Sequence, residues 1–267
     1  MPAATVTART RIVFMIGTPI AQARSPGLFN AHFARTGQDR VMVALDVSPA
    51  ALPGFVATVR DGPNCDGFVS TLPHKHALPA LVDDASPAAI ALDAVNVVAR
   101  MAGGRLYGDM TDGAGFWNGV AAAGFDPRGT SVALAGAGAA ATAIAHEFAV
   151  RGGRRIAVWS RDAVEIDALA ARLAGTPLRV ERGLPDSLSA FSMAINATPL
   201  GMPHAPGSAF SPDLLATMPR DGWAADAITD PLDTEFLTTA RALGLGAVNG
   251  AAMTRGQFER LRDVLGV

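Results

Sequence analysis

The chain has little of several residue types, and each scarcity removes a class of protein. Cys65 is the only cysteine in 267 residues, so no internal disulfide can form and the cysteine clusters of a structural zinc site are missing. Aromatic residues make up only 6%, and the formal net charge of -2 gives no field that would gather nucleic acid or an acidic membrane. We therefore expect a cytoplasmic protein with neither nucleic acid nor membrane as a partner.

Long hydrophobic runs are also missing. No apolar run reaches about 18 residues, the length at which a membrane-spanning helix becomes a candidate. Residues 1–11 carry arginines but lack the apolar centre of a signal peptide, so we expect a soluble protein that is not exported. What is abundant is hydrophobic residues, at 49%, together with 28 Gly and 18 Pro. This composition is typical of a compact, turn-rich protein, long enough for two domains with a core each.

The first half of the chain alternates short apolar runs with helical patterns, which is typical of a βαβ series. We expect strands at 12–16, 41–45 and 67–70, and helices at 27–35 and 50–60. The runs 95–101 and 105–107 flank Gly103 and Gly104, which supply positive φ, and so predict a hairpin.

A second βαβ series follows a helical stretch near 115–123. We expect strands at 131–135, 155–160, 192–197 and 223–226. A helix is expected after the turn 136–141, running to about 151, and further helices at 164–174, 234–243 and 251–265. The sequence thus predicts two open α/β domains, of which the second is Rossmann-like.

The glycine-rich turn Gly136-x-Gly138-x-x-Ala141 follows a predicted strand and opens a predicted helix. This is the setting that the dinucleotide fingerprint requires, because the glycines let backbone N–H groups approach a pyrophosphate at the helix N-terminus. Glycine-rich turns of this kind also occur without a ligand. The candidate cofactor residues in this turn are Gly136, Ala137, Gly138, Ala139 and Ala140.

The end of the next predicted strand bears on the choice between NAD and NADP. NAD-binding folds place an acidic residue there against the ribose 2′-hydroxyl, whereas this chain first offers Ser160 and Arg161. A guanidinium can hold a 2′-phosphate by two hydrogen bonds, which favours NADP. Asp162 follows directly and keeps NAD open, and Arg161 could also be an ordinary solvated side chain.

Seven segments, in their order and spacing along most of the chain, resemble the shikimate dehydrogenase family. They begin with Gly17 to Ile20 and Arg24 to Asn30, and continue with Ser70 to Lys75, Ala94 to Asn96, Gly108 to Gly113, Asn196 to Met202 and Gly250 to Gln257.

The resemblance implies a role for particular residues. Lys75 and Asp112 match the family's catalytic pair. Ser25 matches a serine that holds the substrate carboxylate, and further substrate contacts are implied for Thr71, Asn96 and Gln257. Thr198 lies in the loop beside the nicotinamide, and Gly250 is a further cofactor candidate.

The resemblance also implies how the chain divides. It predicts a substrate domain of residues 1–112 plus 248–267, with the last helix packed back on it, and a dinucleotide domain of residues 113–247. The active site is expected in the cleft between them.

The chain departs from the family pattern mainly where the substrate carboxylate binds. Ala23 stands in place of a serine, and Thr229 in place of a tyrosine. Val69 and Met110 replace asparagines, and Asp93 and Val97 replace a glycine and a threonine. The catalytic pair is kept while the groups that would hold the carboxylate are fewer.

The implied activity is NADP-dependent, reversible reduction of 3-dehydroshikimate to shikimate or of a related cyclic hydroxy acid, on the chorismate route of aromatic amino acid biosynthesis. Carbonyl reduction needs a hydride and a proton, and an ammonium such as that of Lys75 can give the proton. Alternatives are a quinate or aminoshikimate dehydrogenase using NAD, or a non-catalytic dinucleotide-dependent binding protein. We expect a monomer or homodimer and no metal, because His74 and His76 lack further ligands.

Overall fold

The computed structural model describes residues 6–267, so that residues 1–5 of the predicted first domain lie outside the described residues. The chain divides into two compact units. The first unit comprises Met1–Thr111 and Arg260–Val267, and the second comprises Asp112–Glu259. The chain therefore passes from one unit to the other at Thr111–Asp112 and returns at Glu259–Arg260.

The first unit contains a six-stranded mixed sheet in the order β2-β1-β3-β5-β6-β4. Strand β1 runs parallel to both β2 and β3, whereas β5 is antiparallel to β3 and to β6. The predicted hairpin is confirmed, with Gly103 at φ 73° and Gly104 at φ 81° between its strands. The strand bounds are β1 Arg11–Gly17, β2 Arg40–Asp46, β3 Cys65–Ser70, β4 Asp84–Ala85, β5 Val97–Arg100 and β6 Leu106–Asp109.

Helices and short 3₁₀ turns connect these strands. In α2 the buried residues Leu52, Val56 and Val59 recur at helical spacing, so one face of the helix packs on the core. Gly37 ends α1 in the left-handed conformation at φ 67°, which a glycine adopts without strain. The helix bounds are α1 Ser25–Thr36, α2 Leu52–Asp61 and α3 Pro87–Leu92, and the turns are η1 Pro49–Ala51, η2 His74–His76, η3 Leu78–Leu81 and η4 Ala102–Gly104.

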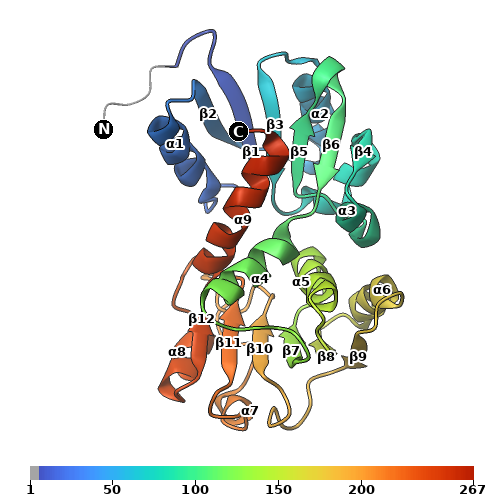
Figure 1. The fold of residues 1–267 in the computed structure, drawn as a ribbon, viewed down its shortest axis with the longest axis vertical. Coiled ribbons are helices and arrows are strands. Elements are labelled where there is room, and N and C mark those ends of the chain that lie inside the picture. The colour runs from blue at the N-terminus through green and yellow to red at the C-terminus, as the bar shows by residue number, and fades with distance from the viewer. Residues whose placement is uncertain (1–5) are drawn as a thin grey trace. The chain divides into compact units, whose positions relative to one another are not determined.

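The second unit contains a six-stranded parallel sheet in the order β12-β11-β10-β7-β8-β9 (Figure 1). The chain starts in the middle at β7, runs outward to β9 and then returns to β10 on the other side. This is the strand order of the doubly wound Rossmann fold, whose ligands bind outside the carboxyl ends of the strands where the order reverses. The strand bounds are β7 Ser131–Ala135, β8 Arg155–Trp159, β9 Arg179–Arg182, β10 Met193–Asn196, β11 Trp223–Asp226 and β12 Gly246–Val248.

The second sheet is buried on both faces. Alternate residues of β7 belong to different cores: Val132 and Leu134 to one, Ala133 and Ala135 to the other. Since successive side chains of a strand point to opposite faces, the helices cover both sides of the sheet. Their bounds are α4 Asp112–Ala122, α5 Ala139–Val150, α6 Ala163–Leu173, α7 Pro212–Leu215, α8 Glu235–Ala242 and α9 Gly250–Leu265.

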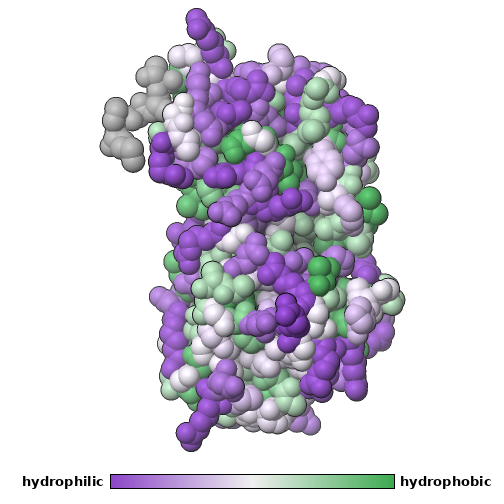
Figure 2. Space-filling view, in the orientation of Figure 1, coloured by the Kyte–Doolittle hydropathy of each residue, from purple (hydrophilic) through white to green (hydrophobic). Residues whose placement is uncertain are grey.

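The surface is mixed in character. On the face shown in Figure 2, hydrophilic and hydrophobic residues are interspersed over both units. Within residues 6–267, none of the helices combines the length and the apolar character needed to cross a membrane.

Candidate active site

In the first unit, the loops that follow β1 and β3 are packed against each other. The Thr71 N–H donates to the Ile16 carbonyl at 2.9 Å, and the Thr18 N–H donates to the Leu72 carbonyl at 3.0 Å. A Cβ on Gly17 would lie only 2.4 Å from Cγ2 of Thr71, so that only glycine allows this approach. The candidate substrate residue Thr71 is thereby fixed beside the loop that leads to Ser25.

Lys75 is the only lysine of the chain and is only 9% exposed, in the 3₁₀ turn η2. Its backbone is held by Val95, whose N–H donates to the Lys75 carbonyl at 2.9 Å. The preceding residue, His74, is buried, and its Nε2 lies 2.8 Å from the Val47 carbonyl. Because a carbonyl oxygen can only accept, Nε2 carries the hydrogen, and His74 anchors the lysine loop.

Asn96 lies beside the Lys75 loop, since its carbonyl accepts from the Ser70 N–H at 2.7 Å. The Asn96 side chain is 1% exposed and is bonded to Thr111: its Oδ1 accepts from the Thr111 N–H at 2.9 Å, and its Nδ2 donates to the Thr111 hydroxyl at 3.1 Å. The first unit thus brings Thr71, Lys75 and Asn96 together and ties them to the end of the segment that enters α4.

Asp112 and Gln257, which are 145 residues apart in sequence, meet in the second unit. Gln257 Nε2 donates to Asp112 Oδ1 at 2.8 Å, and the aspartate is 4% exposed. Gly115 makes room for the glutamine, because a Cβ there would lie 2.5 Å from the Gln257 Cβ. Lys75 and Asp112 belong to different units, Asp112 being the first residue of the second.

The glycine-rich turn has the form that a dinucleotide site needs. Gly136 follows β7 at φ 111°, and a Cβ there would lie 2.8 Å from the Ala197 carbonyl oxygen. Gly138 caps α5 and is exposed, and apart from its chain neighbours no heavy atom lies within 4 Å of the place where its Cβ would be. The N-terminus of a 12-residue helix is therefore open to an anionic group, and Ala139 and Ala140 form its first turn.

Thr198 is held by a buried polar network that sequence reasoning missed. Asn196 Oδ1 accepts from the N–H and the hydroxyl of Thr198, at 3.0 and 2.7 Å. Asn196 Nδ2 donates to Asp226 Oδ1 at 3.2 Å, and Asp226 also accepts from Thr234 and Ile228. Burial raises the pKa of Asp226, against the opposing effect of these hydrogen bonds. The signal was available, since a polar residue ends each of two otherwise apolar strands.

The three polar residues that follow β8 differ in their hydrogen-bond partners. Asp162 caps α6, its Oδ1 accepting from the Val164 N–H at 2.8 Å. Ser160 donates to Glu165 Oε2 at 3.1 Å. The exposed Arg161 side chain makes no hydrogen bond or ion pair with any residue in 6–267, and so it can reach a ligand without breaking a bond of the protein.

The remaining candidates have simpler surroundings. Ser25 is the first residue of α1, half-buried, and its hydroxyl has no hydrogen-bond partner among residues 6–267. Gly250 begins α9, where a Cβ would lie 2.1 Å from the Ile228 carbonyl oxygen, so that close backbone packing already requires a glycine.

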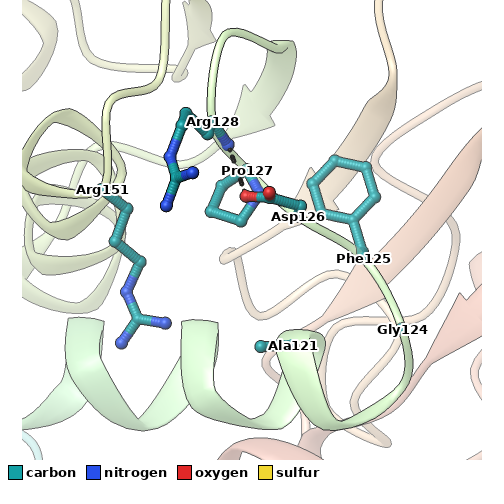
Figure 3. A pocket seen from close by; sticks show the side chains of 7 residues that line it. All are labelled: Ala121, Gly124, Phe125, Asp126, Pro127, Arg128 and Arg151. Carbon is teal, nitrogen blue, oxygen red and sulfur yellow. Dashed lines mark hydrogen bonds between the residues drawn. The ribbon is translucent and has the colours of Figure 1, made fainter.

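A pocket of about 430 Å³ lies elsewhere in the second unit, beside the loop 124–128 (Figure 3). Arg128 and Arg151 point into it, but Arg151 pairs with Glu147 at 2.8 Å and Asp126 accepts from the Arg128 N–H. None of the candidate site residues lines it. Within the described part of the chain, no three His, Cys, Asp or Glu side chains are grouped so that they could hold a metal ion.

Comparison with known proteins identifies the family. The model of the shikimate dehydrogenase substrate binding domain matches residues 15–98. The shikimate dehydrogenase (NADP(+)) of Methylobacterium radiotolerans is 38% identical over 245 residues, which are 90% of this chain and 86% of that protein.

Two solved structures are similar over nearly the whole chain. Shikimate 5-dehydrogenase of Thermus thermophilus, in complex with NADP(H) and shikimate, has a TM-score of 0.84 and 32% identity, covering 96% of this chain and 94% of that one. Ligand-free 5-ketofructose reductase of a Gluconobacter species has a TM-score of 0.86 and 29% identity, covering 97% and 94%. With these similarities, the chain belongs to the shikimate dehydrogenase family.

Proposed function

We propose that this chain catalyses the reversible, NADP-dependent reduction of 3-dehydroshikimate to shikimate. The observation that carries the proposal is the 38% identity to the Methylobacterium enzyme, because it extends over 90% of the chain and so includes both units. The substrate-domain model matches within the first unit, and the Rossmann strand order belongs to the second. We assign substrate binding to the first unit and cofactor binding to the second.

In the proposed mechanism Lys75 is the proton donor. NADPH held by the second unit would supply the hydride for the carbonyl carbon. The Lys75 ammonium donates its proton to the oxygen, where negative charge develops, and in the direction of oxidation the neutral amine takes that proton back. Burial of the lysine on a loop held by His74 and Val95 supports this role, since a fixed group needs no reorganisation during the reaction.

Asp112 and Gln257 form the other part of the proposed site. The carboxylate of Asp112 accepts from Gln257 and has a further lone pair for the reacting hydroxyl. We assign Ser25, Thr71 and Asn96 to the neighbouring groups of the substrate.

The residues of the second unit fit NADP. The pyrophosphate would lie on the N–H groups of the turn at the open N-terminus of α5, and the adenosine 2′-phosphate beside Ser160 and Arg161. Asp162 caps α6 through Oδ1 and keeps Oδ2 as an acceptor, so the preference for NADP rests on Arg161 and not on the loss of this carboxylate. Thr198 and Gly250 are assigned to the nicotinamide end.

A second candidate substrate is a neutral polyhydroxy ketone. Two observations favour it: a methyl group stands at Ala23, where the family pattern has a carboxylate-binding serine, and a 5-ketofructose reductase has the same fold at 29% identity. A site with fewer donors for a carboxylate discriminates less against a substrate that has none.

The test is a panel in which shikimate and quinate are oxidised with NADP⁺ or NAD⁺, and 5-ketofructose is reduced with NADPH or NADH. Absorbance of the reduced cofactor measures each reaction. The proposal expects the highest kcat/KM with shikimate and NADP. Preference for the ketose would establish the second candidate, and no turnover with any compound would favour a dinucleotide-dependent binding protein.

We also propose a cytoplasmic monomer or homodimer. The single Cys65 is buried, and burial raises the pKa of its thiol, so that it is a poor nucleophile and behaves as a core residue. Size-exclusion chromatography with light scattering would give the number of subunits.

A further inference from the structure

Two side-chain pairs join the same two stretches of chain, residues 109–112 and 257–260. In the second unit, Gln257 Nε2 donates to Asp112 Oδ1 at 2.8 Å. In the first unit, Arg260 Nη2 donates to Asp109 Oδ2 at 2.7 Å. The chain passes from one unit to the other within both stretches. The two stretches are therefore joined by one side-chain pair in the first unit and by another in the second.

The Asp109 carboxylate is buried at 2% exposure, at the end of β6. Its Oδ1 accepts from the Met110 N–H at 2.8 Å and from the Ser86 hydroxyl, and both of these donors are neutral. Arg260, whose side chain is 49% exposed, supplies the positive charge. A carboxylate removed from water needs such a charge or a full set of donors to stay in place.

This carboxylate fixes the backbone that leads to Asp112. It holds the Met110 N–H, while the Asp109 carbonyl accepts from the Asn96 N–H at 3.0 Å and Asn96 Oδ1 accepts from the Thr111 N–H at 2.9 Å. The three residues before Asp112 are therefore bonded to the segment that lies beside the Lys75 loop.

We propose that Arg260 is a positioning residue of the reaction. By neutralising Asp109 it holds the segment 109–111 and so sets the place at which Asp112 begins α4. The proposal rests on the function proposed above for Asp112. It gives the C-terminal helix two tasks three residues apart: Gln257 binds the catalytic carboxylate, and Arg260 fixes the chain that carries it.

The test compares Arg260→Gln with Arg255→Gln. Arg255 is an exposed arginine on the same helix with no partner among residues 6–267, so the matched change removes a charge without removing a contact. Arg260→Gln should lower kcat for shikimate oxidation by about 10- to 100-fold, the range that misplacing a catalytic group by about 1 Å can reach. The Kd for NADP should stay unchanged, Arg260→Lys should recover part of the loss, and Arg255→Gln should behave as wild type.

Two further measurements separate positioning from general damage. If Arg260 acts through Asp109, the Arg260→Gln change should have much less effect in an Asp109→Asn background. Hydrogen exchange should become faster at the amides of residues 110–113 in Arg260→Gln and not in Arg255→Gln. If Arg260→Gln does not fold, Arg260→Lys serves in its place, with a smaller loss expected from its single ammonium.

The outcomes are distinct for the two proposals. Unchanged exchange at residues 110–113, equal effects of Arg260→Gln in both backgrounds, or faster exchange with normal kcat would each overturn the positioning role. If wild type does not oxidise shikimate but Arg260→Gln still exchanges faster at residues 110–113, the proposed function is removed. The control of the segment 109–111 by Arg260 then stands.

Discussion

Lys75 owes its position to backbone contacts of its neighbours more than to a long regular element. The 3₁₀ turn that carries it is three residues long and is fixed by His74 on one side and by Val95 on the other. The order of motifs predicted the importance of this loop. It could not show that His74 would be an anchor, because the partner is a main-chain carbonyl, that of Val47, far along the chain.

Lys75→Ala removes the proposed proton donor. Turnover should fall by at least about 10²- to 10⁴-fold, the contribution of a positioned acid or base, while the Kd for NADP changes little because the lysine belongs to the other unit. The neighbouring His76→Ala serves as the control. Steady-state kinetics and cofactor titration check this, and a near-normal kcat would remove Lys75 from the mechanism.

Arg161→Ala tests the cofactor preference. Because the guanidinium makes no bond within residues 6–267, its loss should leave the fold unchanged. NADP binding should weaken by about 1.5–3 kcal/mol, the value of a hydrogen bond to a charged group, while NAD binding stays nearly constant. Fluorescence titration with the two reduced cofactors measures both constants, and an equal loss for both would mean that Arg161 is structural.

Ala23→Ser distinguishes the two candidate substrates. An added hydroxyl can donate to a carboxylate, so kcat/KM for shikimate should rise by up to about 10- to 150-fold, corresponding to ~1.5–3 kcal/mol, with water competition reducing the gain. Even a several-fold gain supports a carboxylate at this place. No gain, or a gain with 5-ketofructose instead, would speak against shikimate bound in the family's manner.

One departure from the family pattern has a backbone explanation. Asp93 stands where the pattern has a glycine, and it ends α3 at φ 47° in the left-handed region. Aspartate is among the few residues that tolerate this conformation. The sequence shows that an aspartate replaces the glycine. It does not show the φ value of residue 93, which explains why an aspartate is tolerated there.

Among the elements, the long periodic ones were predictable and the short ones were not. Strands β7 and β11 have the predicted bounds, and most helices begin and end within a few residues of the prediction. The short elements β4, β9, β12, α3 and α7 were missed. A strand of two to four residues carries too little alternation to be recognised, and its position depends on the strand beside it. The parallel order of the second sheet followed from the βαβ series, whereas the antiparallel β3–β5 pairing in the first did not.

The packing of α4 against α9 depends on glycines. A Cβ on Gly119 would lie 2.4 Å from the Ala252 carbonyl oxygen, and one on Gly256 would lie 2.4 Å from the Gly115 carbonyl oxygen. This approach is what brings Gln257 to Asp112, a contact that the resemblance alone did not describe.

Gly115→Ala should therefore damage both stability and activity. The new methyl group meets the Gln257 Cβ, and overpacking of this kind costs about 1–3 kcal/mol. Displacement of Gln257 should also lower kcat. The control is Gly54→Ala in α2, where the space is open and a gain of about 0.4–1 kcal/mol is expected from the restricted unfolded chain. Urea unfolding and kinetics of both variants test this, and equal behaviour would contradict the packing argument.

At the scale of the whole molecule, the division into a substrate domain and a dinucleotide domain stays a prediction from the two βαβ series and the family resemblance. The structure puts the return at Glu259–Arg260, inside a continuous helix. A helical pattern has no feature that marks such a point, because the periodicity continues through it.

The pH dependence of global stability has an identifiable contributor in the first unit. His32 is buried, and Arg35 Nη2 lies 3.0 Å from its Nδ1. Burial lowers the pKa of His32, and the positive charges of Arg262 and Arg35 lower it further. Since the unfolded chain takes up this proton more readily, folding loses stability as the pH falls below the ordinary histidine pKa of about 6.5.

As the pH falls from 8, wild type should therefore lose more free energy of unfolding than His32→Gln. Below about pH 6.5 the two slopes should differ by up to about 1.4 kcal/mol per pH unit, the contribution of one proton. His204→Gln, which removes an exposed histidine, is the control and should follow wild type. Chemical denaturation at a series of pH values measures the slopes. Parallel curves for wild type and His32→Gln would exclude His32 as the source.

The single lysine makes the proposed reaction centre spectroscopically unique. All other basic side chains among the 22 Lys and Arg residues are arginines, so a sample grown with isotope-labelled lysine carries its label in Lys75 alone. One ε-carbon resonance then reports protonation, substrate arrival and cofactor arrival in an intact wild-type protein of 27.4 kDa, with no assignment step and no engineered probe. Reductive methylation of the ε-amine, read from the mass of the peptide that contains Lys75, then measures directly how well bound shikimate shields it.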